Sequence, residues 1–134
     1  MAAVGSAVDV VAAWHAAVNA ADAERLAALL DPAVEVGGPR GTGHGAALVL
    51  AWVGRAGIRL EPGRVFHRGD TVVVEQRATW RSPDSGEDGP PQEVASVFAV
   101  GGGVVRRVVR HADLGEALAA AGLDEADAVR PSER

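Results

Sequence analysis

The chain has no cysteine, tyrosine or lysine among its 134 residues, and aromatic residues make up only 4% of it. Without cysteine there are no disulfides, thiol nucleophiles or thiolate metal ligands, although this absence is compatible with any compartment. All 13 basic residues are arginine, and the formal net charge is −5. This acidic balance argues against non-specific binding to nucleic acid or to an anionic membrane. Because aromatic residues are scarce, Trp14, Trp52 and Trp80 stand out as large apolar groups for core packing.

Long hydrophobic runs are also missing. No apolar run reaches 18 residues, and no basic segment followed by an apolar one opens the chain, so we expect a cytoplasmic protein. A length of 134 residues allows one domain with a genuine core. We therefore expect a single domain over residues 1–123, followed by a polar tail, residues 124–134, that frays from it.

Apolar periodicity predicts helices in the first part of the chain and again near its end. Apolar residues at i, i+4, i+7 and i+11 predict a helix over residues 7–18, and Asp22 is a suitable N-cap for a short second helix. Apolar pairs four residues apart predict a third helix over residues 46–55. Near the end, Asp113 resembles the cap of a short final helix that Gly122 would close.

β-branched residues dominate most of the remaining sequence. A short strand is expected over residues 33–36, directly after Pro32, which disfavours helical geometry in the residue before it. The longer runs are separated by short turn-forming segments, which predict hairpins and antiparallel pairing. These longer strands are expected over residues 58–67, 71–81, 93–100 and 104–111.

The glycine-rich stretch "GGPRGTGHGAALVLAWV", residues 37–53, nearly fits two nucleotide-binding signatures. The spacing of its glycines matches a P-loop, but His44 and Gly45 stand where Lys and Ser/Thr would hold phosphate and Mg²⁺. It also matches a dinucleotide fingerprint, yet the strands that follow are joined by hairpins rather than by crossover helices. We therefore expect a loop that leads from the first strand into the third helix, with glycines that allow a turn.

Four segments together resemble the NTF2-like superfamily, and in particular its SnoaL-like and ketosteroid-isomerase-like branches. The resemblance implies an α+β cone in which N-terminal helices pack on a strongly bent, mainly antiparallel sheet with a short C-terminal helix. It also implies a largely apolar pocket at the open end and a homodimer formed through the sheet. The segments are "AWHAAVNAADAERLAALLDPAVEV", "GTGHGAALVLAWV", "GDTVVVEQRATW" and "GGVVRRVVRHADLGEALAAAGL".

The catalytic residues of two related enzyme classes are only partly retained. Aligned with ketosteroid isomerases, the oxyanion-binding tyrosine falls on Trp14 and the general base falls on Gly37. Aligned with limonene-epoxide-hydrolase-like members, the arginine of the Asp-Arg-Asp arrangement is Arg77, whereas the two acids fall on Thr79 and Arg110. The resemblance therefore implies neither mechanism in its known form.

Polar residues of the predicted strands supply the remaining candidates. Strand alternation places Glu75 and Arg77 on one face, which the hydrolase-like alignment turns toward the pocket; a solvated face or a dimer interface is the alternative. His111 ends the last strand, where its near-neutral pKa suits proton transfer, with Asp113 as a partner of the kind that SnoaL-like cyclases use. The catalytic candidates are therefore Glu75, Arg77 and His111. The expected pocket residues are Trp14, Trp52, Thr79 and Arg110.

Two functions stay open at this point. The first is an enzyme of isomerase, hydrolase or cyclase type that uses general acid/base chemistry on a small apolar organic ligand. The second is a non-catalytic ligand-binding protein or a dimeric structural module. The four histidines lack HxH or HxxxH spacing, so we expect no metal site and no cofactor.

Overall fold

The computed structural model describes residues 7–38, 41–56, 58–80 and 89–129, with residues 52–56 described by their backbone alone. None of the helices in these ranges has the length and hydrophobicity that a membrane crossing requires. In chain order the elements are α1 (Ala7–Ala20), α2 (Ala23–Ala28), β1 (Leu30–Gly38), β2 (Gly41–His44), α3 (Ala46–Ala56), β3 (Arg59–Arg68), β4 (Thr71–Thr79), β5 (Gln92–Gly101), β6 (Val104–His111), α4 (Leu114–Ala121) and the 3₁₀ turn η1 (Glu125–Asp127).

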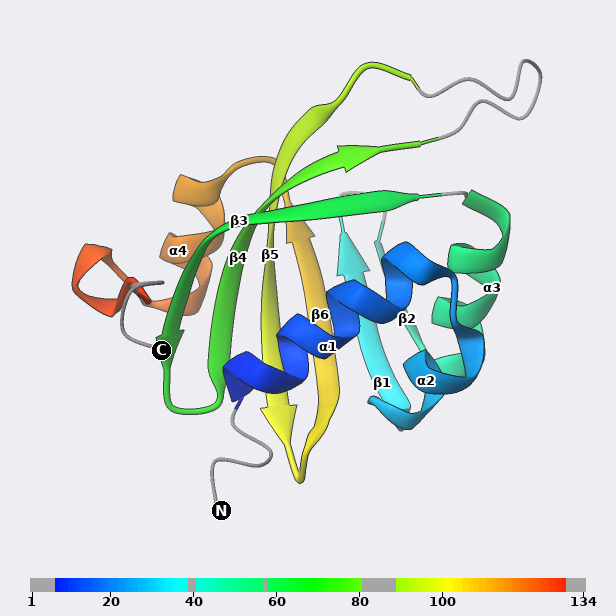
Figure 1. Ribbon diagram of the computed structural model, residues 1–134. Helices are drawn as coiled ribbons and strands as arrows, with labels where there is room; N and C mark the ends of the chain where they lie inside the picture. Colours follow the sequence, from blue (N-terminus) through cyan, green and yellow to red (C-terminus); the bar gives the residue numbers. More distant parts are fainter. Residues whose placement is uncertain (1–6, 39–40, 57, 81–88, 130–134) are drawn as a thin grey trace.

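The strands form one six-stranded sheet in the order β2-β1-β6-β5-β4-β3. All neighbouring strands run antiparallel except β1 and β6, which are parallel. The sheet curls without closing, with α1, α2 and α3 on its concave side and α4 on its convex side (Figure 1). This arrangement confirms the predicted α+β cone, and the four longer strands are antiparallel neighbours as predicted.

Helix α1 packs across the concave face of the sheet. Trp14 and Val18 of α1 are buried in one cluster with Val72, Val74 and Phe98 of the sheet, so the predicted apolar stripe faces the core. The end of α1 is fixed to β3, because the Asn19 amide donates to the carbonyl of Leu60 at 2.7 Å and accepts from its N–H at 2.7 Å. These bonds satisfy backbone groups of Leu60 and fix one wall of the space beneath the sheet.

The helix boundaries follow the predicted caps. The side chain of Asp22 accepts a hydrogen bond from the N–H of Arg25, and that of Asp113 accepts one from Glu116. Gly122 ends α4 in the left-handed conformation with φ 74°, which favours glycine. The chain then folds back so that the N–H of Leu123 donates to the carbonyl of Leu118. Both N-caps and the glycine ending are thus confirmed.

The glycine-rich stretch differs from the expected loop. Residues Gly41–His44 form strand β2, which pairs antiparallel with the end of β1, and β1 itself begins earlier than predicted, at Leu30. Glycine-rich segments have low β-propensity, so this strand is not predicted from its sequence. It forms because β1 supplies its hydrogen-bond partners. Gly45, with φ 107°, then turns the chain into α3, and its N–H donates to the carbonyl of Val34. The stretch is therefore a hairpin followed by a helix.

The segment after Asp124 does not fray, contrary to expectation, as far as Val129. The 3₁₀ turn η1 has its own capping box, and Val129 donates its N–H to the carbonyl of Val65 at 2.7 Å, beside the bridge between Ala128 and Phe66. Arg68 adds an ion pair with Asp127 at 2.7 Å. These contacts cover the outer edge of β3, which would otherwise present unpaired backbone groups. The expected fraying of residues 130–134 lies outside the described residues.

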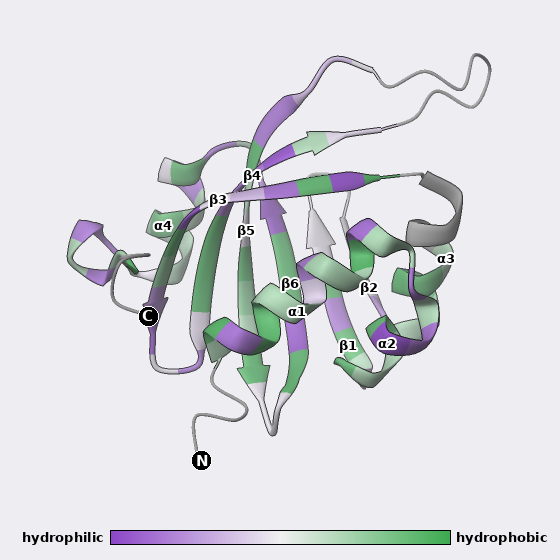
Figure 2. Ribbon diagram, viewed as in Figure 1, coloured by the Kyte–Doolittle hydropathy of each residue, from purple (hydrophilic) through white to green (hydrophobic). Residues whose placement is uncertain are grey.

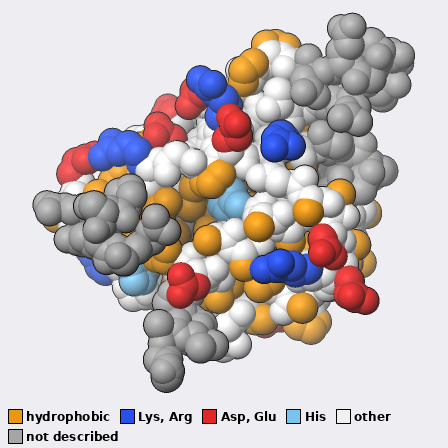
Figure 3. All heavy atoms as spheres, in the orientation of Figure 1, with side chains coloured by type: hydrophobic (Ala, Val, Ile, Leu, Met, Phe, Trp, Pro, Cys, Tyr) orange, Lys and Arg blue, Asp and Glu red, His pale blue; other side chains and the backbone are white. Residues whose placement is uncertain are grey.

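The two faces of the sheet are both apolar where helices cover them. Most of β5 and the lower part of β4 are green in Figure 2, because α1 covers one face and α4 the other. The charged side chains lie around this core. On the face shown in Figure 3, acidic and basic side chains alternate without a continuous patch of one sign among the described residues.

Candidate functional site

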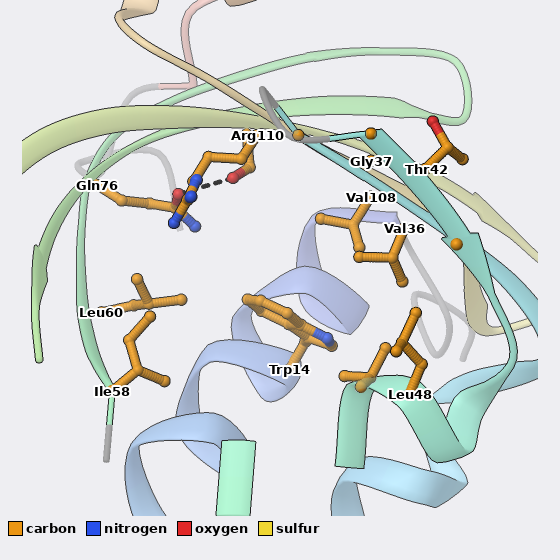
Figure 4. A pocket seen from close by; sticks show the side chains of 15 residues that line it. Trp14, Val36, Gly37, Thr42, Leu48, Ile58, Leu60, Gln76, Val108 and Arg110 are labelled. Atoms are coloured by element: carbon orange, nitrogen blue, oxygen red, sulfur yellow. Dashed lines mark hydrogen bonds between the residues drawn. The ribbon is translucent and has the colours of Figure 1, made fainter. Parts of the chain in front are cut away.

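A cavity of about 490 Å³ lies between α1, α3, the β1–β2 hairpin and the concave face of the sheet. Apolar side chains and glycine backbone form most of its wall, and polar side chains gather at one end (Figure 4). Because the sheet curls, α1 and α3 stay separated from its concave face, and the cavity occupies the space between them. The lining residues are Trp14, Val36, Gly37, Gly38, Gly41, Thr42, Gly43, Leu48, Val49, Ile58, Leu60, Gln76, Ser96, Val108 and Arg110.

A buried hydrogen-bond chain forms part of the polar end. The Ser96 hydroxyl donates to the Gln76 side-chain oxygen at 2.8 Å, and the Gln76 amide nitrogen lies 2.8 Å from Nε2 of His15. Nδ1 of His15 lies 2.9 Å from the carbonyl of Val11, which can only accept, so Nδ1 carries the proton and Nε2 accepts from Gln76. Burial lowers the pKa of His15, against the raising effect of the bond to Val11. His15 is therefore neutral, and it fixes the orientation of the Gln76 carboxamide.

Arg110 brings a positive charge to the same end of the cavity. Its guanidinium points toward Gln76 in Figure 4 and lies 5.7 Å from the ring centroid of Trp80. The other two arginines of β6 have carboxylate partners: Arg106 lies 3.5 Å from Asp31, and Arg107 lies 3.3 Å from Glu35. Within the described ranges, no carboxylate lies within ion-pair distance of Arg110.

Trp14 forms the opposite wall and is 3% exposed. Its ring packs edge-on against His15 and Phe98, with centroid distances of 5.0 Å to each. The indole N–H is buried and has no acceptor among the residues that the structure describes. Leaving a buried donor unpaired is costly, so this is an unusual group to find in the wall of a cavity.

The SnoaL-like domain family matches residues 11–111. This chain belongs to that family. No curated protein matches its sequence. Membership of this family explains the fold, but the same fold carries many unrelated activities. The chemistry of the cavity must therefore be argued from its own residues.

Three solved structures show how widely this SnoaL-like fold is shared. An NTF2-like protein of unknown function from Cytophaga hutchinsonii has 14% identity, TM-score 0.72, and a match over 81% of this chain and 90% of its own. A putative polyketide cyclase from Sinorhizobium meliloti has 21% identity and TM-score 0.65 over 77% and 94%. TerC, co-crystallised with polyporic acid, has 24% identity and TM-score 0.68 over 80% and 91%. At these identities the likeness establishes the fold alone.

Two of the predicted pocket residues of this SnoaL-like domain, Trp14 and Arg110, line the cavity. Thr79 does not, because it alternates with Ala78, whose side chain is buried in the cluster beneath α1. Trp52 belongs to α3, but its side chain lies outside the described residues. The backbone of Gly37 borders the cavity, and a Cβ there would lie 3.4 Å from Val109 and 3.6 Å from the hydroxyl of Thr42, itself a lining residue. Because residue 37 is glycine, no side chain supplies a base at this point of the wall.

The three catalytic candidates lie on the convex face of the sheet. The orientation toward the pocket that the hydrolase-like alignment implies for Glu75 and Arg77 is therefore wrong. Val74 and Gln76 face the cavity side, which turns Glu75 and Arg77 away from it by strand alternation. Arg77 pairs with Glu93 at 3.1 Å instead of with Glu75.

His111 follows the same pattern on β6, where it alternates with the cavity-lining Arg110. It pairs in register with Ala95, which is buried in the cluster beneath α4. Its Nδ1 lies 3.1 Å from a carboxylate oxygen of Glu116 at the start of α4, while the side chain of Asp113 caps this helix by accepting from the N–H of Glu116. The structure therefore does not bring Glu75, Arg77 and His111 together in one pocket.

Sequence reasoning missed the polar chain formed by His15, Gln76 and Ser96. A signal was present on β4, where Gln76 interrupts an otherwise apolar face that runs from Val72 to Trp80 at alternate positions. A buried glutamine needs partners, so this interruption could have pointed to a polar site. Within the described ranges, no group of three or more His, Asp or Glu side chains could hold a metal ion.

Proposed function

We propose that this SnoaL-like domain binds one small, largely apolar organic molecule in the cavity beneath the sheet. The single observation that carries the proposal is the cavity itself, whose volume of about 490 Å³ falls in the range of small-molecule sites. Ligand pockets of this kind combine mostly apolar walls with a few convergent polar groups, which is the arrangement found here.

The walls and the polar end have different tasks in this proposal. Val36, Leu60 and Val108 lose solvent-exposed apolar surface when a ring fills the cavity, which favours binding by roughly 25 cal/mol per Å² buried. At the polar end, one N–H of the Gln76 amide is engaged by His15, which leaves the other for an acceptor on the ligand. The polar end then sets the orientation of the molecule, while the walls supply most of the affinity.

Of the two functions that the sequence leaves open, the arrangement favours binding over acid/base catalysis. The described lining contains no carboxylate and no histidine, and the predicted acid/base groups lie behind the sheet. His15 is held neutral behind Gln76, where its one acceptor nitrogen is already used. Because TerC was crystallised with polyporic acid, flat organic molecules are sensible first probes.

Titration with the neutral fluorophore N-phenyl-1-naphthylamine tests the proposal. Wild type should bind it with saturable fluorescence enhancement. Val108→Phe, which fills the cavity from the middle of β6, should weaken binding by about 10-fold or more, since overlap with the probe costs at least 1.4 kcal/mol. Val109→Phe is the matched control, because Val109 lies opposite Val97, which packs in the cluster beneath α4, so its side chain projects from the same strand to the convex face. Equal binding by both variants, or no binding by wild type, would refute the proposal.

A further inference from the structure

The charge of the cavity wall is one-sided. Among the described lining residues Arg110 is the one ionised side chain, and its guanidinium points across the polar end toward Gln76 (Figure 4). Ser96 stands directly opposite Arg110 on the neighbouring strand, in register with it. The polar end therefore gathers a cation and amide or hydroxyl donors, a set suited to an oxygen that carries negative charge.

The local ion pairs leave this cation available. Arg106 and Arg107 point to carboxylates supplied by β1, Asp31 and Glu35, whereas Arg110 meets no carboxylate in the described part of the chain. The ring of Trp80 lies beneath its guanidinium at 5.7 Å, which orients the group without neutralising it. A half-buried arginine without a counter-ion gains most from an anion that enters the cavity, where water screens the interaction less than on the surface.

We infer that the ligand is an organic acid that enters as an anion, with an ionised carboxylate or enolate oxygen on Arg110 and its apolar body against the opposite walls. This inference rests on the proposed function and adds the chemical class of the ligand. Arg110 can donate two parallel N–H bonds to a carboxylate, and the Gln76 amide supplies a further donor at the same end. Arg110 is thus the residue that determines specificity for an acid over its neutral analogue.

Competition between two probes of equal shape tests the inference. 2-Naphthoate and 2-naphthamide share one ring system and differ in charge, and each displaces N-phenyl-1-naphthylamine if it enters the cavity. At pH 7.5 wild type should prefer the acid by about 10-fold, since a charge-assisted bond is roughly twice as strong as a neutral one. Arg110→Gln should bring this ratio to about 1, while Arg77→Gln, an exposed arginine on the convex face paired with Glu93, should leave it unchanged.

The outcomes separate this inference from the function on which it rests. If wild type does not bind the fluorophore, the proposed binding function fails. If it binds the fluorophore but 2-naphthoate does not displace it, the assignment of an anion to Arg110 is wrong. If both displace it equally from wild type, or if Arg110→Gln keeps the preference, the cavity binds ligands but the assignment of an anion to Arg110 is wrong. Should Arg110→Gln fail to fold, Arg110→Lys decides the matter, because it must retain a preference for the acid that weakens as salt increases while binding of the amide does not.

Discussion

Replacing Gln76 by leucine tests the most deeply buried polar feature of the domain. The exposed fractions of His15, Gln76 and Ser96 are 2%, 1% and 4%, so their hydrogen bonds are made out of contact with bulk water. Leucine preserves most of the volume of glutamine and creates little cavity. It removes both partners at once, leaving Nε2 of His15 without a donor and the Ser96 hydroxyl without its acceptor.

The expected cost follows from these two groups. Each unsatisfied buried polar group costs about 1–3 kcal/mol, so Gln76→Leu should lower the free energy of unfolding by about 3 kcal/mol. Ser96 borders the cavity, where water can hydrogen-bond to its hydroxyl. The expected loss of stability is therefore smaller than the sum of the two upper limits. A loss of this size is a large fraction of the roughly 5–15 kcal/mol that stabilises a typical domain.

Urea unfolding followed by tryptophan fluorescence measures this loss. Gln92→Leu is the control, because Gln92 is an exposed glutamine at the start of β5 and its replacement should change stability by no more than about 0.5 kcal/mol. The double variant Gln76→Leu/Ser96→Ala should lose less than the sum of its single variants, since the hydroxyl is then no longer stranded. If Gln76→Leu costs as little as Gln92→Leu, or if the losses from Gln76→Leu and Ser96→Ala are additive, the buried hydrogen bonds of Gln76 do not stabilise the domain in this way.

Three further predictions concern pH, the C-terminal segment and assembly. Burial lowers the pKa of His15 below its unfolded value of about 6.5, so between these two pKa values only the unfolded chain holds the proton. The free energy of unfolding is therefore highest above pH 6.5 and decreases as pH falls. In urea titrations, His15→Phe should make this free energy less dependent on pH. The N–H of Asp124 and the guanidinium of Arg68 lower the pKa of Asp127 from its usual 3.8, so at neutral pH, where this carboxylate is ionised, Asp127→Asn should reduce the protection factor of the Val129 amide against hydrogen exchange. In wild type the same protection factor should fall as pH decreases below about 4, and an unchanged protection factor would contradict this role. The homodimer expected through the sheet stays a prediction: light scattering should give about twice the chain mass of 13.7 kDa, and a monomer would disprove it.

Local signals were sufficient to predict the main elements of the fold. Helix α1 was predictable because its apolar stripe has a helical period, and α4 because Asp113 and Gly122 punctuate it. Strand β2 could not be predicted from local signals, because its Gly and Thr residues form a strand only by pairing with β1. The hydrogen bond from Val129 to Val65 could not be predicted either, because it joins parts of the chain that are far apart in the sequence.

The orientation of β4 is where the prediction of the site failed. Both faces of this strand are buried, so Val72, Val73 and Val74 give no alternation from which the cavity side could be read. The alignment with hydrolase-like members then decided the face, and an error of one position turns every side chain to the other side. Arg110 lines the cavity, whereas His111, one residue later on the same strand, points away from it.

A methyl NMR titration with N-phenyl-1-naphthylamine tests most directly whether the cavity is the binding site. Binding in the cavity should give saturable shift changes at Ile58, Leu60 and Val108, which line it, and none at Val73 or Val97, which pack in the cluster beneath α4. Shift changes at Val73 and Val97 without changes at the cavity residues, or no saturable change at all, would contradict binding in the cavity.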